Sequence, residues 1–344
     1  MNLSLMTLGD LVTDPVTGGR ESTAQRHRAI VEAAAVADQA GFRSVHVGEH
    51  HGMDYVYSAP PVILAAIAER TEHIKLSTGV ALAANLDPVR AAEDYATVHA
   101  LSGGRAEMVV GRGNFFTTTY DLFGQDPADS HELFAENIEL ILDLWSGREV
   151  TWQGKHRAPV TEFRLEPSLD VAPRMWVGGG ASESTTMLAA RLGLDLMLPS
   201  AFGSPAMFAS TMEQFRSLYA EHRHERAPQV GACWHVNVDT SSQRARERWE
   251  PRYRKYFELF GEIIRRVNPD PPAFVKKPFD WEWLTTKGPA IVGSPEEVVD
   301  RLSTVTQSLQ ADVNLIYIDM GGQPTGEFCD MVELIGSEVL PKLH

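Results

Sequence analysis

Short apolar runs alternate along the chain with longer segments in which apolar positions recur at a helical period. The short runs predict strands, whereas the longer segments are rich in alanine, leucine and glutamate and predict helices. Eight strand–helix units follow one another, and their predicted strands are 2–8, 44–48, 74–82, 106–111, 174–177, 194–198, 230–238 and 313–319. Strands that are apolar throughout are typical of a parallel sheet buried on both faces. Eight of them favour the α/β class and a closed TIM (β/α)8 barrel with insertions.

Two segments interrupt this alternation. Residues 148–171, with Trp152 and several prolines, predict a short excursion from the barrel, in the form of a hairpin. Residues 268–289, with Trp281 and two lysines, predict a long irregular loop. Because long loops without secondary structure are usually functional or disordered, the aromatic and lysine content of this loop favours a lid. We expect a single domain that spans residues 1–344.

Composition narrows the class of partner and the compartment. The 46 acidic and 31 basic residues give a net charge of −15, which argues against binding to nucleic acid or to anionic membranes. Cys233 and Cys329 are far apart and form no CxxC pair, so we expect neither a disulfide framework nor a zinc ribbon. No window of 18 consecutive apolar residues and no leader pattern is present, and we expect a cytoplasmic protein without a membrane span.

The second predicted strand ends in the sequence 48–52, which contains Glu49, His50 and His51. The carboxyl ends of TIM-barrel strands are where active sites are built. Neighbouring strand residues point to opposite sides, so the two histidines are not expected to bind one metal, and we expect no metal site. A single histidine with a pKa near neutrality suits proton transfer. The alternative is a hydrogen-bonded histidine that only completes the strand.

Two glycine-bearing turns, 111–114 and 178–182, end the fourth and fifth predicted strands. Backbone N–H groups at a helix N-terminus favour a phosphate group, and Arg112 would supply its counter-charge. Neither turn reads GxGxxG, so a Rossmann dinucleotide site is not supported. Glycine also punctuates many turns without a ligand, but two such turns on adjacent strands favour a phosphate.

Further short motifs are spread over nearly the whole chain: Gly41-Phe42, Glu49-His50-His51, Ser58-Ala59-Pro60, Asp87-Pro88-Val89-Arg90, Gly104-Arg105, Gly111-Arg112-Gly113, Ser184-Thr185-Thr186 and Gly293-Ser294-Pro295-Glu296-Glu297. Through these motifs the chain resembles the flavin-dependent bacterial luciferase superfamily. The match is specific in the first half and looser from about residue 200 onward. The resemblance implies a TIM barrel that uses reduced FMN (FMNH2), delivered by a separate NAD(P)H:flavin reductase.

The resemblance also implies roles for individual residues. His50 matches the essential histidine of the family, and a cis peptide bond that does not involve proline is expected beneath the flavin ring at Gly79-Val80. The residues expected to bind the flavin phosphate are Arg112, Gly180, Ala181, Ser182 and Thr185. The chain departs from luciferase in two places. Gly111 stands where luciferase has a reactive cysteine, and a pocket tryptophan is replaced near Ser200. We therefore do not expect light emission from a long-chain aldehyde.

We predict a monooxygenase in which O2 adds at C4a of FMNH2 to give a flavin peroxide, with His50 setting its protonation. The organic substrate is expected to be small and largely apolar. Trp234 and His235 occupy opposite faces of the seventh predicted strand, and either could line the pocket. The residues predicted to line the substrate pocket are Met6, Glu49, Phe115, Trp234, Trp281 and Met320.

Three alternatives remain open beside this prediction. An F420-dependent oxidoreductase would transfer a hydride on the same fold without oxygen. A non-catalytic protein would only store flavin, and a metal-dependent barrel hydrolase is remote because no His/Asp set converges. The helices predicted at 60–70 and 88–101 are rich in small apolar residues, which predicts a homodimer. The alternative for these helices is burial within the same chain.

Overall fold

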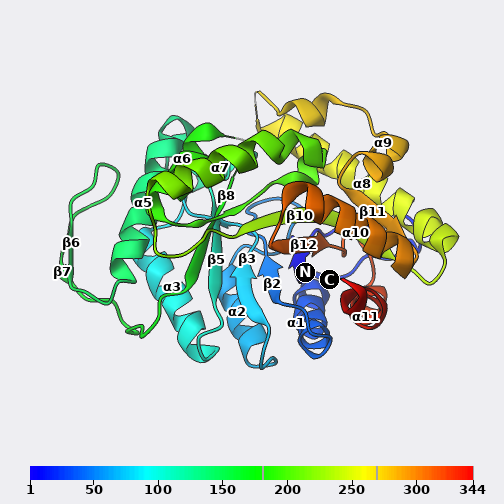
Figure 1. The fold of residues 1–344 in the computed structure, drawn as a ribbon, viewed down its shortest axis with the longest axis horizontal. Helices are drawn as coiled ribbons and strands as arrows, with labels where there is room; N and C mark the ends of the chain where they lie inside the picture. Colours follow the sequence, from blue (N-terminus) through cyan, green and yellow to red (C-terminus); the bar gives the residue numbers. More distant parts are fainter. Residues whose placement is uncertain (180–181, 269, 344) are drawn as a thin grey trace.

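The computed structural model describes residues 1–179, 182–268 and 270–343, and its centre is a parallel barrel (Figure 1). Its strands are hydrogen-bonded in the order β3-β2-β1-β12-β10-β9-β8-β5-β4, and a bridge between Leu76 and Ala106 joins β3 to the start of β5. β3 and β4 are two pieces of one predicted strand, so they fill one of eight positions and the predicted TIM barrel is confirmed. The strands are β1 (Asn2–Thr7), β2 (Ser44–Val47), β3 (Lys75–Thr78), β4 (Ala81–Leu82), β5 (Glu107–Gly111), β8 (Arg174–Gly178), β9 (Asp195–Met197), β10 (Val230–Val238) and β12 (Val313–Tyr317).

Helices surround the barrel, close to where the sequence pattern predicts them except for the short helix at Thr118–Leu122, which was not predicted. They are α1 (Thr23–Gln39), α2 (Pro60–Ala68), α3 (Pro88–Leu101), α4 (Thr118–Leu122), α5 (Ser130–Leu144), α6 (Glu183–Leu192), α7 (Ala209–Glu221), α8 (Ser242–Val267), α10 (Pro295–Leu309) and α11 (Thr325–Leu334). Local chemistry fixes several starts. The Asp87 carboxylate accepts hydrogen bonds from two backbone N–H groups of α3, and Ser294 and Glu297 form a capping box at α10. Among the described residues, no helix is long and apolar enough to cross a membrane.

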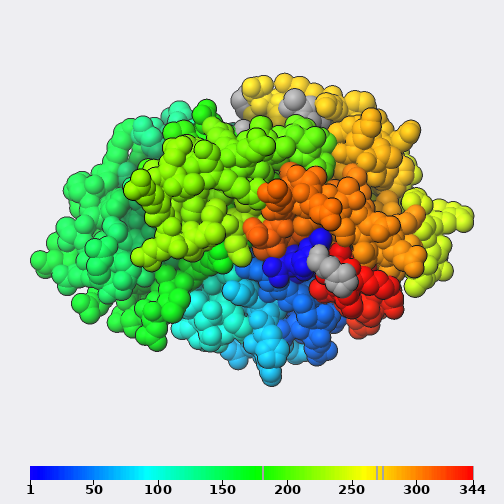
Figure 2. All heavy atoms as spheres, viewed as in Figure 1, coloured from blue at the N-terminus to red at the C-terminus, as the bar shows by residue number. Residues whose placement is uncertain are grey.

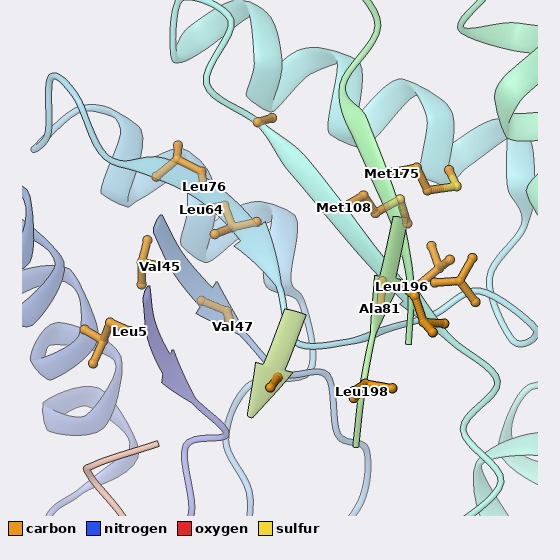
Figure 3. Packing of buried hydrophobic residues seen from close by; sticks show 14 of the residues in the cluster. Leu5, Val45, Val47, Leu64, Leu76, Ala81, Met108, Met175, Leu196 and Leu198 are labelled. Carbon is orange, nitrogen blue, oxygen red and sulfur yellow. The ribbon is translucent and has the colours of Figure 1, made fainter. Parts of the chain in front are cut away.

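The apolar core lies mainly between the barrel and the helices. Leu5 of β1, Val45 of β2 and Leu76 of β3 are fully buried there, and Figure 3 shows Leu64 of α2 beside Leu76. Alternate residues point into the barrel instead, where Trp176 belongs to a separate interior cluster. The alternation of side chains along each strand therefore decides which residues can reach the mouth of the barrel.

The first interruption is a hairpin, as predicted. β6 (Val150–Trp152) and β7 (Val160–Phe163) pair antiparallel and extend away from the barrel, on the left in Figure 1. The second interruption is not the irregular loop that the sequence pattern predicts. It contains a 3-10 turn at Ala273–Lys276 and α9 (Trp281–Thr286), and β11 (Ala290–Gly293) follows it and pairs with the end of β10.

This second segment is held by contacts that depend on tertiary structure. The Asp280 carboxylate caps α9 by accepting from the Trp283 N–H, at 3.0 Å. The Trp281 ring packs against Trp249 of α8, with ring centroids 5.8 Å apart. The aromatic residues of this segment therefore pack on α8.

The first and last strands of the barrel are neighbours. β1 pairs with β12 in parallel, with Asn2 opposite Val313. Figure 2 shows the blue N-terminal residues between the orange segment around α10 and the red C-terminal segment. Closure of the barrel thus brings the two ends of the chain together.

Candidate active site

A cavity of about 280 Å³ opens at the carboxyl ends of the barrel strands. Every barrel position contributes a lining residue, either from the strand or from the turn that follows it. Three of the six predicted pocket residues, Met6, Glu49 and Phe115, line it. This end of a TIM barrel is where catalytic sites of the fold are formed.

One side of the cavity, here called the glycine wall, consists of Gly79, Val80, Gly111, Gly178 and Gly179. A Cβ at Gly111 would lie 2.4 Å from Cγ2 of Val80, and one at Gly178 would lie 2.9 Å from Cγ1 of Val80. Both glycines are therefore needed for the close approach of Val80. The Gly79-Val80 peptide bond is cis, as predicted. The wall is a backbone surface that suits the flat face of a ring system.

A cation and two hydroxyl groups lie at one end of the glycine wall. Arg112 lines the cavity together with Ser182 and Thr185 at the start of α6. Its guanidinium donates to the Ser130 hydroxyl at 3.1 Å, and no carboxylate of the described residues lies within ion-pair distance of it. Burial lowers the pKa of Arg112, as expected for a cation that lacks a counter-charge.

This arrangement fits the phosphate of a flavin, because charge and hydroxyl donors meet at a helix N-terminus. Two predicted phosphate ligands, Gly180 and Ala181, lie outside the described residues.

His50 lines the cavity next to the glycine wall. Its ring stacks on Tyr55, with centroids 4.2 Å apart, and meets the edge of Phe116 at 5.3 Å. Its Nδ1 is buried without a hydrogen-bond partner among the described residues. Burial lowers the pKa of His50 to about 3, helped by the nearby His51. The expected pKa near neutrality is therefore wrong, since the site desolvates the imidazolium, and His50 is neutral at physiological pH.

Glu49 and His51 hold the end of this strand in place. The Nε2 of His51 lies 2.8 Å from Oε1 of Glu49, while the other Glu49 oxygen accepts from the Leu82 N–H at 2.8 Å. His51 also meets the ring of Phe123, at 4.9 Å, so the two histidines contact different groups. The Glu49 carboxylate thus ties the second barrel strand to β4 on the adjacent position.

A second side of the cavity, here called the aromatic wall, consists of Phe115, Phe116, Phe202, Tyr256 and Phe260. Phe202 and Phe260 stack with centroids 5.4 Å apart, and Tyr256 stacks with Phe260 at 6.0 Å. α8 supplies Tyr256 and Phe260, a loop supplies Phe115 and Phe116, and a 3-10 turn at Ser200–Phe202 supplies the fifth ring. These rings offer large contact surfaces to an apolar ligand.

Three predicted pocket residues lie elsewhere. Trp234 points outward from β10, where its indole N–H donates to Asn314 at 2.9 Å. Strand parity turns the next residue, His235, into the cavity in its place. Trp281 packs on α8, and Met320 is fully buried in the apolar cluster beneath α8.

His235 is joined to a tyrosine that the sequence did not indicate. The Nδ1 of His235 and the hydroxyl of Tyr253 lie 2.6 Å apart. Burial lowers the pKa of His235 to about 3, so this imidazole is also neutral at physiological pH. The contact spans 18 residues along the chain and depends on α8 folding back over the barrel mouth.

One group of possible metal ligands occurs in the described part of the chain, Asp129, Glu132 and His156. It lies outside the cavity, and Glu132 already pairs with Lys155 and with the His156 ring. The group has the character of a surface ion-pair cluster.

Comparison with known proteins identifies the family. Residues 1–312 match the family model of the luciferase-like monooxygenases, so the chain belongs to this family and is an oxidoreductase. It is 23% identical to the oxygenase component of a flavin-dependent trigonelline monooxygenase from Acinetobacter baylyi, over 99% of this chain and 95% of the relative.

Solved structures agree on the fold. A monooxygenase from Streptomyces bottropensis superimposes with a TM-score of 0.86 at 22% identity, over 100% of both chains. The oxygenating constituent of a 3,6-diketocamphane monooxygenase from Pseudomonas putida, in complex with FMN, gives 0.76 at 18% identity, over 100% of this chain and 99% of the other.

Similar proteins also include F420-dependent enzymes. An F420-dependent glucose-6-phosphate dehydrogenase from Nakamurella multipartita is 22% identical over 96% of this chain and 97% of its own length. Membership of the family is therefore compatible with either cofactor.

Proposed function

We propose that the protein is the oxygenase of a two-component monooxygenase. It would take FMNH2 from a separate NAD(P)H:flavin reductase and use O2 to oxygenate a small, largely apolar organic substrate. The observation that carries this proposal is Arg112, a cavity cation without a carboxylate partner in the described part of the chain, at one end of the glycine wall. A ligand with a flat ring system and a terminal phosphate fits that combination.

The residues would share the work as follows. Arg112, Ser182 and Thr185 would hold the phosphate, and the glycine wall would support the ring. Reduced FMN supplies the activation of O2 when it is bound. His50, neutral and with its Nδ1 unpartnered among the described residues, would form a hydrogen bond to the reacting group at the reacting end of the cavity. The aromatic wall would keep water away from that end.

The alternative function is F420-dependent hydride transfer, which similar enzymes of the same fold perform. It differs from our proposal in cofactor and in its independence of O2. A binding experiment under anaerobic conditions separates the two.

The test is a titration of the protein with FMNH2, reduced riboflavin and reduced F420, followed by quenching of tryptophan fluorescence. We expect FMNH2 to bind at least tenfold more tightly than the other two, because riboflavin lacks a phosphate and the phosphate of F420 is an internal, singly charged diester rather than a terminal monoester. Arg112→Gln should weaken FMNH2 roughly tenfold and leave riboflavin unchanged. Arg70→Gln, at an exposed arginine, is the matched control. Tighter binding of F420 than of FMNH2 would overturn the proposal.

We also propose that the protein is a homodimer. The small residues of α3, Ala91, Ala92 and Ala96, are buried within one chain, and Trp145 of α5 donates to the Ala92 carbonyl. An exposed apolar residue remains on α2, where Val62 is 71% exposed. A monomeric mass by light scattering would contradict the dimer.

A further inference from the structure

The proposed chemistry does not use His235, a polar residue that lines the cavity on the side covered by α8. It is buried to 6% exposure and lines the cavity from β10. Tyr253, Tyr256 and Tyr317 surround its ring, with centroids 5.1, 6.2 and 5.9 Å away. The Tyr253 hydroxyl is hydrogen-bonded to Nδ1 of His235, and Nε2 has no hydrogen-bond partner among the described residues. Nε2 is therefore the nitrogen that remains for a ligand.

The hydrogen bond to Tyr253 determines which nitrogen of His235 carries the proton. Burial keeps His235 neutral and raises the pKa of Tyr253, so the pair has one imidazole proton and one hydroxyl proton. Within the described residues, the Tyr253 hydroxyl bonds only to Nδ1. If Nδ1 carried the proton, the buried hydroxyl proton would lack an acceptor, which costs about 1–3 kcal/mol. The favoured arrangement has the Tyr253 O–H donating to Nδ1 and the proton of His235 on Nε2.

We propose that Nε2–H of His235 is the donor that recognises the organic substrate, through a neutral acceptor oxygen such as the carbonyl of an aromatic ketone. Tyr253 is the positioning residue that fixes this tautomer. The inference rests on the proposed function, because it assigns the substrate of the same cavity. The rings of the aromatic wall bind the apolar body of the substrate, and His235 orients it.

Charge excludes an acid as the substrate on this side. Among the described lining residues, Arg112 is the one permanent cation, and the proposed phosphate site uses it. His50 and His235 are neutral, and Glu49 is an acid. A carboxylate next to His235 would be desolvated without a counter-charge, whereas a ketone would not.

The tautomer is tested by long-range 1H–15N spectra of histidine side chains, which distinguish an imidazole protonated on Nε2 from one protonated on Nδ1. His235→Gln identifies the resonance by its disappearance. We expect the Nε2–H pattern in the wild-type protein and a change in that resonance in Tyr253→Phe. An Nδ1–H pattern for His235 would overturn the proposal.

Recognition is tested with three probes of similar size: acetophenone, ethylbenzene and benzoate, whose binding is measured by ligand-observed NMR with and without FMN. We expect acetophenone to bind more tightly than the other two. His235→Leu should weaken acetophenone roughly tenfold and ethylbenzene less than twofold, whereas His235→Gln retains a donor and should recover most of the affinity. His73→Leu, at an exposed histidine, is the matched control. Equal losses for acetophenone and ethylbenzene would overturn the proposal.

A parallel FMNH2 titration separates this inference from the proposed function. We expect the His235 variants to bind FMNH2 within twofold of the wild-type protein. If FMNH2 fails to bind while the ketone preference depends on His235, the proposed function fails and the recognition stands. If FMNH2 binds and the ketone preference is independent of His235, the recognition fails alone.

Discussion

The two walls of the cavity are built in different ways. The glycine wall comes from turns at the ends of β3, β5 and β8, and its shape depends on missing side chains: a Cβ at Gly111 would collide with Val80. The aromatic wall comes from a loop, a 3-10 turn and α8, and its shape depends on large rings that stack on one another. A change on the first side must therefore alter the barrel backbone, whereas a change on the second only exchanges side chains. This difference suits a fixed cofactor on one side and a variable substrate on the other.

The largest effect is expected at His50, where the two walls meet. His50→Ala should leave FMNH2 binding within threefold and shorten the delay before oxidised FMN appears by a factor of about 100 or more, because the hydrogen bond that His50 would make to the reacting group is lost. Stopped-flow absorbance after mixing the FMNH2 complex with oxygenated buffer measures this delay. His222→Ala, at an exposed histidine, is the control. An unchanged delay in His50→Ala would remove His50 from the mechanism.

The next effect concerns stability, because two buried neutral histidines line the cavity. Burial lowers the pKa of His50 and of His235 to about 3, below the unfolded value of about 6.5. The two neutral histidines make their full contribution to the free energy of unfolding above pH 6.5. This contribution decreases as the pH falls, and at pH 5 it is smaller by about 2 kcal/mol for each histidine. Urea unfolding at pH 7, 6 and 5 should show a smaller loss in His235→Gln than in the wild-type protein.

A buried acid works against this loss, so variants rather than total values must be compared. Burial raises the pKa of Asp319 to about 6, and its contribution to stability therefore increases as the pH falls through 6. The exposed His73 provides the control, since His73→Gln should retain the full pH dependence. A pH dependence in His235→Gln identical to that of the wild-type protein would show that His235 titrates normally.

A smaller effect is expected from filling the glycine wall. Gly111→Ala should weaken FMNH2 binding roughly tenfold, because the new methyl group displaces Val80 into the cavity. Val80→Ala in the same chain should restore much of the affinity by removing the colliding methyl groups. Gly326→Ala places a methyl group in open space on α11 and serves as the control. Failure of the double variant to recover would mean that the collision is not the cause.

The smallest effects distinguish the rings that line the cavity from those behind them. Phe116→Leu should weaken acetophenone several-fold, because Phe116 belongs to the aromatic wall. Trp281→Phe should change the same affinity less than twofold, because Trp281 packs on α8 outside the cavity. NMR titration of both variants with acetophenone compares their affinities directly. A larger loss of affinity in Trp281→Phe than in Phe116→Leu would contradict the assignment of Phe116, and not Trp281, to the aromatic wall.

Much of the fold could be predicted, because each barrel strand is a continuous apolar run and each glycine turn is visible in the sequence. His50, Arg112, Ser182 and Thr185 were placed correctly at the mouth by the position of their motifs at strand ends. β11 was not predicted, since its four residues directly follow residues 268–289, whose aromatic composition indicated a loop.

The substrate side was harder to predict, because contacts distant in sequence define it. Choosing between Trp234 and His235 requires the face of β10 that points inward, which the pairing of His235 with Tyr317 on β12 establishes. The contact between His235 and Tyr253 requires the path of α8 over the mouth. The neutral state of His50 requires its burial against Tyr55 and Phe116, which residue type alone does not reveal.

The position of α8 has a consequence for how new specificities arise in this architecture. β10 pairs directly with β12 in the barrel sheet. Residues 242–293, which lie between these strands in the sequence, therefore form an excursion that leaves the barrel at the end of β10 and returns to it at β11. This excursion supplies Tyr253, Tyr256 and Phe260 without being needed to close the barrel. Mutation and recombination can therefore exchange the part of the proposed substrate surface that α8 supplies, while the barrel that would bind the cofactor is inherited unchanged.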